Sequence, residues 1–537
     1  MQNQKLFLTI AIFLTIFLLW DKWQITHTTD ENGNLIKKTQ LVLDAPTTNS
    51  DVPMINTEAQ ALDISTPSIV ENHGFTTVTT DLLTVEISHQ GGTIQNAYLN
   101  QFPTELGGND KFQLLNNRPG VIFQAQSGLA SRDEMLPTHL SKFDSANTNY
   151  QLTGDTLVVP LTWKGPEGIT VTKNFRFNKN SYVIDIDYEV QNQSNQSIPA
   201  KSYVRLSRNA IGQGNMMMPT FTGGIIYDKA SHTVQKNEFD EWNEFEHQQA
   251  IGGWMAMVEQ YFMAAWIPDT NTTQAFSSSI DNNLYKLTNA NQQVNIAAGE
   301  TMTIGNNQLY LGPKEYGKIE EIATGLHYTL DYGWLDILAD PLSWGMHKIH
   351  EFVSSWGLSI IIITILIKLA FYPLSEKSYR SMAGMRKLSP RLAKLKETYG
   401  DDRQKMGQKT MELYKKEKIN PASGCLPILV QIPVFIAFYW MLLDTVELRQ
   451  TAFWWIPDLA DMDPYFILPI IMGASMFVQQ KLNPPPPDPM QAKIMMSLPF
   501  VFTIMFLWFP AGLVLYWVFN NILSIAQQWT INKRIGS

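Results

Sequence analysis

The feature that most constrains this chain is a set of long uncharged apolar stretches in its last third. Residues 494–532 contain no Asp, Glu, Lys or Arg over 39 positions, and residues 421–443 contain none over 23. A helix of 39 residues would be roughly 58 Å long, nearly twice the thickness of a bilayer core. Pro510, Ala511 and Gly512 supply a turn near its middle, which divides the stretch into two spans. These stretches predict membrane-spanning helices rather than a soluble core.

Six spans are predicted in all, and the basic residues beside them predict their orientation. The connection 375–420 holds 13 basic and six acidic residues, so it is expected in the cytoplasm. The next loop, 444–464, holds Arg449 against five acidic residues and is expected outside. Residues 24–347, with 18 basic and 35 acidic residues, then lie outside as well. Both termini are expected in the cytoplasm.

The overall composition excludes several classes of protein. The net charge of −9 argues against DNA binding, which needs a basic surface to neutralise phosphates. One cysteine allows no internal disulfide, and all nine histidines lie at or before His350. No predicted span contains Asp or Glu, so the usual membrane hydrolases are excluded. His347, His350 and Glu351 lack the order of known zinc motifs. No enzymatic activity, metal or cofactor is predicted.

The chain outside these spans predicts a domain order. Residues 1–25 form an uncleaved signal anchor, and residues 26–72, rich in Thr, Asn, Asp and Pro, form a flexible linker. Short alternating strands separated by turn signals make residues 73–330 a β-sandwich. Residues 331–355 form an amphipathic helix, and residues 356–537 form a membrane core of five spans.

The amphipathic helix carries apolar residues at the spacing of one helix face. We expect it to lie on the outer membrane surface, because such helices bury their apolar face at the lipid boundary. The residues expected to face lipid are Trp334, Leu335, Leu338, Leu342 and Trp344.

The basic connection 375–420 has the pattern of a helical hairpin. Apolar residues recur at a spacing of three and four from Met385 to Tyr399, a turn follows at Gly400, and a second helix runs to Lys418. Its basic face would contact ribosomal RNA, anionic lipid or a targeting partner, or would only obey the charge rule of cytoplasmic loops. The residues assigned to this partner surface are Arg380, Arg386, Lys387, Lys394, Lys405 and Lys409.

Lys368 is the only charge in residues 356–374. An ammonium within hydrocarbon costs roughly 2.5 to 3.5 kcal/mol and tends to mark a water-filled cavity. Snorkelling to the cytoplasmic headgroups is the alternative, because Pro373 follows only five residues later.

The last span supports the cavity interpretation, because it is polar along one side. Seven residues, Gln527 among them, share one arc of about 140°, and lipid would leave their polar groups unsatisfied. We therefore predict a hydrophilic intramembrane groove, with a dry network of interhelical hydrogen bonds as the alternative. The residues assigned to this groove are Lys368, Thr364, Gln431, Tyr516, Trp517, Asn520, Asn521, Ser524 and Gln528.

Ordered motifs along the whole chain resemble one known family. They include the run of isoleucines before Thr364 and Lys368, the Tyr-Pro-Leu at 372–374, the Gly-Cys-Leu-Pro at 424–427, the Val-Glu-Leu-Arg-Gln at 446–450 and the stretch 507–516. The outer part contributes Gly-Gly-Trp at 252–254 and Ala-Trp-Ile-Pro at 265–268. The chain resembles the YidC family of inner-membrane insertases of Gram-negative bacteria.

This resemblance implies a polytopic α-helical membrane protein with a five-helix insertase core, an N-terminal anchor and a large periplasmic β-supersandwich. It implies a groove open to cytoplasm and lipid. The implied partners are nascent membrane proteins, the Sec translocon, the ribosome, the signal-recognition pathway and the phospholipid bilayer. Lys368 takes the place of an arginine found in many relatives, and Trp517 that of a tyrosine. A small-anion transporter using Lys368 is the alternative function, and a sugar-isomerising outer domain with His89 and Glu86 is a third.

Overall fold

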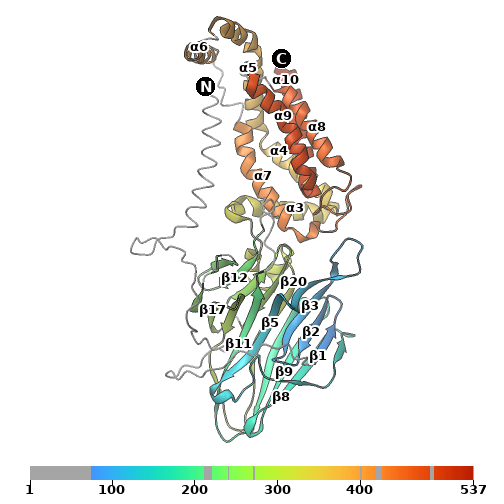
Figure 1. Ribbon diagram of the computed structural model, residues 1–537, viewed down its shortest axis with the longest axis vertical. Helices are drawn as coiled ribbons and strands as arrows, with labels where there is room; N and C mark the ends of the chain where they lie inside the picture. The colour runs from blue at the N-terminus through green and yellow to red at the C-terminus, as the bar shows by residue number, and fades with distance from the viewer. Residues whose placement is uncertain are drawn as a thin grey trace, which may run out of the picture.

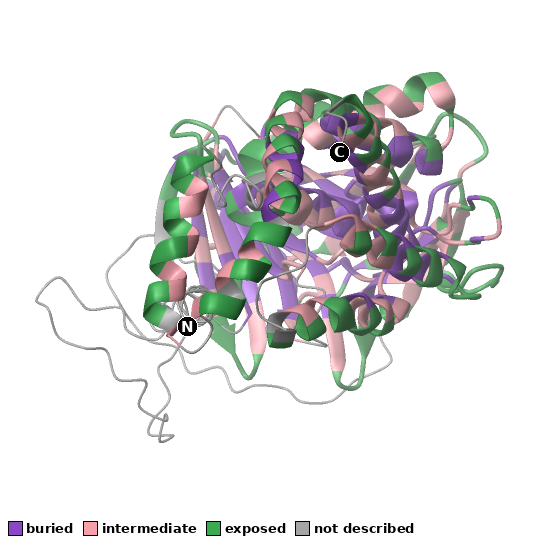
Figure 2. Cartoon of the chain, turned by 90° about the horizontal axis from the view of Figure 1, so that it is seen from above, coloured by how far each residue is buried: buried purple, intermediate pink, exposed green. Residues whose placement is uncertain are grey.

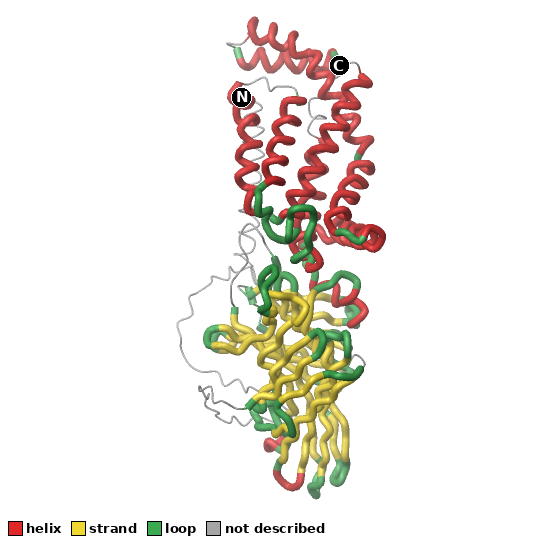
Figure 3. The backbone as a smooth tube through the Cα atoms, turned by 90° about the vertical axis from the view of Figure 1, so that its right-hand side faces the viewer, coloured by secondary structure: helices red, strands yellow, loops and turns green. Residues whose placement is uncertain are grey.

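The computed structural model describes residues 74–210, 220–239, 241–242, 244–269, 272–399, 402–417, 426–483 and 489–535. The predicted signal anchor and linker, residues 1–72, lie outside these ranges. Within them a β-rich domain and a helical domain are stacked along the long axis of the molecule (Figure 1). Figure 3 shows the same division, with strands gathered at one end and helices at the other.

The β-rich domain contains two large sheets, built almost wholly from antiparallel strand pairs. The parallel pairing of β1 with β7 is an exception. The first sheet has the order β14-β17-β18-β11-β5-β4-β3-β2-β1-β7, with β19 paired to β11. Its strands are β1 Phe75–Thr79, β2 Leu83–Ser88, β3 Thr93–Pro103, β4 Lys111–Arg118, β5 Val121–Ser131, β7 Asn149–Gln151, β11 Ile198–Asn209, β14 Phe245–Ile251, β17 Thr273–Asp281, β18 Leu284–Ala290 and β19 Val294–Ile296.

The second sheet has the order β13-β12-β15-β16-β20-β10-β9-β8-β6. Its long central strand β20 pairs with β10 on one side and β16 on the other. Its strands are β6 Asp144–Ser145, β8 Thr156–Lys164, β9 Ile169–Asn178, β10 Val183–Asn192, β12 Gly223–Asp228, β13 Thr233–Glu238, β15 Trp254–Val258, β16 Phe262–Ile267 and β20 Thr301–Pro313.

Alternation of buried and half-buried residues explains why β9 forms a strand, whereas β15 and β16 are buried along their whole length. In β9 the residues from Ile169 to Asn178 alternate without a break, so one face of the strand enters the core. Phe175 and Phe177 of β9 pack with Leu206 of β11, from the other sheet, in one apolar cluster. The purple strands of Figure 2 mark this buried layer.

The helical domain follows the apolar stretches of the sequence. The predicted break at Pro510 is confirmed, because α9 ends at Met505 and α10 begins at Ala511. The predicted two helices of the basic hairpin are confirmed as α5 and α6. A short helix, α2 Lys318–Ile322, belongs to the outer, β-rich domain. The helices that follow it are α3 Asp336–Val353, α4 Trp356–Ala370, α5 Tyr372–Tyr399, α6 Arg403–Lys416, α7 Leu426–Asp444, α8 Ile467–Leu482, α9 Pro489–Met505 and α10 Ala511–Ile535.

No single helix of the described residues is both long and apolar enough to cross a membrane by itself. Helix α4 and the first part of α5, Tyr372–Leu388, meet that test together as a pair bent by 65°. Three shorter apolar helices accompany them, at Val430–Asp444, Ile467–Leu482 and Ala492–Trp508. The count of six spans therefore stays a prediction.

The segment predicted as an amphipathic helix contains α3. Some of the apolar residues expected to face lipid are exposed, and others are buried. Trp334 and Trp344 are exposed, at 75% and 58% of their surfaces. Leu335, by contrast, is only 2% exposed, and Leu342 is half-buried. The expectation that Leu335 faces lipid is wrong, because it packs in the apolar cluster that joins the two domains.

Candidate functional site

Lys368 lies in the last turn of α4, and its side chain is directed at α10. Lys368 is 4% exposed, and its ammonium donates a hydrogen bond of 2.7 Å to Ser524 Oγ. Ser524 Oγ in turn donates to the carbonyl of Asn520 one turn earlier. In the described part of the chain no carboxylate pairs with Lys368. The buried cation is therefore held by a neutral hydroxyl.

A second contact brings α7 into the same site. Gln431 Nε2 donates to Asn520 Oδ1 at 3.2 Å, so the residues predicted on three different helices meet around α10. Thr364 is buried at 1% exposure on α4, and its hydroxyl donates to the carbonyl of Ile360 in its own helix. Thr364 therefore packs in the site, but its hydroxyl proton is already donated to Ile360 O and is not free for another acceptor.

The other edge of the polar arc of α10 faces α8. Asn521 Nδ2 donates to Ser475 Oγ at 3.1 Å, and both residues are buried. Gln528 Nε2 donates to Leu482 O and Asn483 Oδ1, at the end of α8. These contacts are interhelical hydrogen bonds that hold the bundle together. The arc is thus divided between a cation site and a packing network.

Tyr516 and Trp517 lie in an aromatic group near the start of α10. The Tyr516 ring lies 4.6 Å from that of Phe438, and the Trp517 ring lies 4.5 Å from that of Phe435. Trp517 Nε1 is buried without a hydrogen-bond partner, as are the side-chain oxygens of Gln527 and Gln528. A buried polar atom without a partner costs about 1 to 3 kcal/mol, so these three atoms are unfavourably placed for stability.

Tyr379 belongs to this site and was missed by the sequence analysis. Its side chain is buried next to Ser524, so Ser524 lies between Tyr379 of α5 and Lys368 of α4. The sequence assigned Tyr379 to a cytoplasmic hairpin that begins at residue 375. Helix α5 begins earlier, at Tyr372, and packs along α10. No local pattern distinguishes this tyrosine from the hairpin surface.

The basic hairpin residues have different roles in the structure. Arg380, Lys405 and Lys409 each pair with an acidic residue three or four positions away in the chain. Arg386 instead donates to the carbonyl of Leu482 at 2.7 Å, where α8 ends. The remaining two residues of the predicted partner surface, Lys387 and Lys394, are exposed.

No group of three or more His, Cys, Asp or Glu residues in the described ranges is arranged to hold a metal ion. His347 Nε2 lies 3.3 Å from Glu447 Oε1, and the His347 ring stacks on Tyr316. The His350 ring stacks on Trp356, with centroids 3.9 Å apart. These histidines therefore join α3 to its neighbours.

Two family models match the chain, and together they cover most of it. Residues 76–345 match the YidC periplasmic domain. Residues 348–537 match the 60Kd inner membrane protein family. The boundary between the two matches falls within α3, between the β-rich and helical domains.

Curated relatives match over the full length. A membrane protein insertase YidC of Vesicomyosocius okutanii is 59% identical, with 100% of each chain covered. One of Ruthia magnifica is also 59% identical over 100% of each chain. A solved structure of an active YidC insertase is similar at 14% identity and a TM-score of 0.41, covering 84% of this chain and 94% of its own.

Proposed function

The chain belongs to the YidC family of membrane protein insertases, and we propose that it receives the polar tail of each client at the site around Lys368. The family is located in the bacterial inner membrane and has a periplasmic domain. The alternative of a small-anion transporter is not retained, because full-length relatives are named insertases.

The observation that carries this proposal is the incomplete hydrogen bonding of Lys368. A lysine ammonium has three N–H donors, and Ser524 is the only acceptor that the described side chains offer it. The buried partnerless atoms of Trp517 and Gln527 lie on the same helix as Ser524. A polar tail placed among them would gain hydrogen bonds that replace its water, which lowers the cost of burying it.

The helices around the site favour the same mechanism by their length. Helix α8 has 16 residues and is therefore about 24 Å long, shorter than a bilayer core of roughly 30 Å. Short helices thin the bilayer locally, and a thinner core shortens the path of a polar tail. The client's own hydrophobic span then partitions into lipid along the exposed apolar side chains of α4 and α9 and supplies the driving force.

The proposal extends to orientation and partners. Both termini and the α5–α6 hairpin lie in the cytoplasm, where the hairpin meets the ribosome or the signal-recognition pathway. Lys387 and Lys394 are exposed without acidic neighbours in the pairs described, so they are the strongest candidates for that contact. The Sec translocon is the proposed partner for clients with large translocated domains.

A cross-linking experiment tests the site. A photoreactive residue is placed at position 364, 368 or 517, and a ribosome-stalled client is offered to the protein in membranes. Matched controls carry the probe at Ile522 and Trp529, which are exposed on α10 at 43% and 60%. We expect the client's polar tail to cross-link to the three site positions. Cross-links of that tail confined to the two controls would contradict the proposal.

A further inference from the structure

A second buried lysine joins the two domains of the protein. Lys314 follows the end of β20 in the outer domain and is 1% exposed. Its ammonium lies 2.6 Å from Asp444 Oδ1, on the last residue of α7 in the membrane core. Asp444 is buried as well. The two charges are 130 residues apart in the chain and come from different domains.

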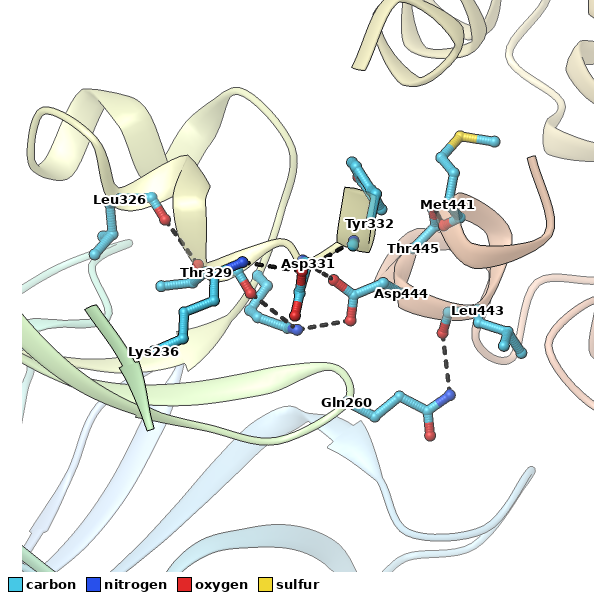
Figure 4. Close-up of polar contacts among 12 residues, drawn as sticks. Lys236, Gln260, Leu326, Thr329, Asp331, Tyr332, Met441, Leu443, Asp444 and Thr445 are labelled. Carbon is cyan, nitrogen blue, oxygen red and sulfur yellow. Dashed lines mark hydrogen bonds and ion pairs between the residues drawn. The ribbon is translucent and has the colours of Figure 1, made fainter. Parts of the chain in front are cut away.

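The connection between the domains is held by the same group of charges. Lys314 Nζ also donates to Thr329 O, and Asp331 N donates to the second oxygen of Asp444 at 3.4 Å. Asp331 itself pairs with Lys236 of β13 at 2.9 Å. Figure 4 shows this arrangement, with the 329–332 segment lying between β-strands on one side and the end of α7 on the other.

This group contains two cations and two carboxylates, so its charges balance. Burying an ion pair is expensive unless the remaining donors and acceptors are also satisfied, and here two backbone groups, Thr329 O and Asp331 N, each satisfy one of them. Next to the pair, Gln260 Nε2 of the outer domain donates to Leu443 O of α7 at 3.0 Å. Two further bonds, from Arg449 and Gln450, hold Pro103 O at the end of β3.

We propose that Lys236, Lys314, Asp331 and Asp444 form a junction clamp that makes the outer domain and the outer end of α7 one rigid unit. Movement of the outer domain therefore moves α7. Asp444 lies 13 residues after Gln431 on that helix, about 20 Å along its axis. The clamp gives the large outer domain a mechanical connection to the core, and it does not depend on the role proposed for Lys368.

Amide hydrogen exchange of the full chain in lipid nanodiscs tests the clamp. The single variants are Lys314→Met and Asp444→Leu. We expect each to raise exchange at least tenfold on both sides of the junction, in residues 314–336 and in the last turn of α7. The matched control is Glu315→Gln with Lys318→Met, which removes an ion pair confined to the outer domain. We expect less than a twofold change from it.

The double variant Lys314→Met with Asp444→Leu shows whether the two residues act as one ion pair or whether each substitution destabilises the junction independently. Replacing both partners of a buried pair by apolar residues is often neutral, so we expect exchange within threefold of the wild type. This variant remains folded on our proposal even where a single variant does not fold. Two results would overturn the clamp. One is that a single variant raises the exchange rate only in the domain that carries the substitution. The other is that the double variant raises the exchange rate by the product of the two single effects.

Discussion

Buried lysines in the outer domain and in the membrane core have different environments. Lys173 of β9 is fully buried, and its three N–H groups have three acceptors: the carbonyls of Gly91 and Gly92, at 2.9 and 2.8 Å, and of Ser127 at 3.3 Å. Lys368 donates to one hydroxyl. All three donors of Lys173 are used within the fold, whereas Lys368 keeps unused donors, which the proposed function assigns to a client's polar tail.

Replacing Lys173 tests whether this lysine stabilises the fold, and it has the largest expected effect on the free energy. Lys173→Met removes the three hydrogen bonds that the ammonium donates to backbone carbonyls, so the free energy of unfolding of the outer domain should fall by about 3 kcal/mol. Thermal unfolding of the full chain followed by circular dichroism measures it. Lys142→Met, at an exposed lysine, is the control. A loss under about 1 kcal/mol would show that the three bonds of Lys173 are not stabilising.

Replacing Lys368 tests the second lysine of this comparison, the one in the membrane core. Lys368→Met should slow insertion of a client with an acidic tail at least tenfold, or about 1.4 kcal/mol of barrier, while the protein stays folded. Insertion is measured by protease protection of the client in proteoliposomes. Lys368→Arg keeps the charge and should retain most of the activity. Equal insertion by the wild type and the methionine variant would be incompatible with a client role for Lys368.

A substitution on the side of the α10 arc that packs against α8 should lower stability and leave insertion nearly unchanged. This is the opposite of the effect expected for Lys368. Asn521→Leu removes the hydrogen bond that Asn521 donates to Ser475, and the buried Ser475 hydroxyl loses this donor. The free energy of unfolding should therefore fall by about 1 kcal/mol. Insertion should change less than twofold, because Asn521 faces α8 and not Lys368. The two readouts are a melting temperature and the same protease-protection assay. A tenfold loss of insertion without unfolding would place Asn521 in the client site.

The smallest effect is expected at Ser524, which positions Lys368 without being the charge itself. Ser524→Ala removes the acceptor of the lysine, yet the ammonium remains in the site. Insertion of the acidic-tail client should fall about threefold, close to 0.6 kcal/mol. The charge dependence of insertion should survive, and its disappearance would assign Ser524 a direct contact with the client.

Local patterns in the sequence were sufficient for the elements of the fold. Alternation identified β9, and the Pro510 turn separated α9 from α10, because both depend on neighbouring residues. Gln431 of α7 contacts Asn520 of the polar arc of α10, one turn from Ser524, while the assignment of these residues to a client groove stays a prediction. Local pattern could not separate the arc into a cation side and a packing side, since that depends on which helix lies opposite each residue.

Contacts between distant parts of the chain were beyond local pattern. Lys314 and Asp444 are separated by 130 residues, and each is an ordinary charged residue in its own segment. Val518 of α10 is apolar and lies outside the polar arc, yet it is 3% exposed because it packs in the apolar cluster. Leu335 is buried for the same reason. Burial at a junction or within a bundle follows from tertiary packing, which periodicity along one helix does not contain.

The most direct test of the role of Lys368 is the dependence of insertion on the charge of the client's tail. Two clients differ only in having an acidic or a neutral tail, and their insertion rates are compared in wild-type protein and in Lys368→Met. If the ammonium receives the tail, the wild type prefers the acidic client severalfold and the variant shows no preference. A preference of equal size in both proteins would contradict the account.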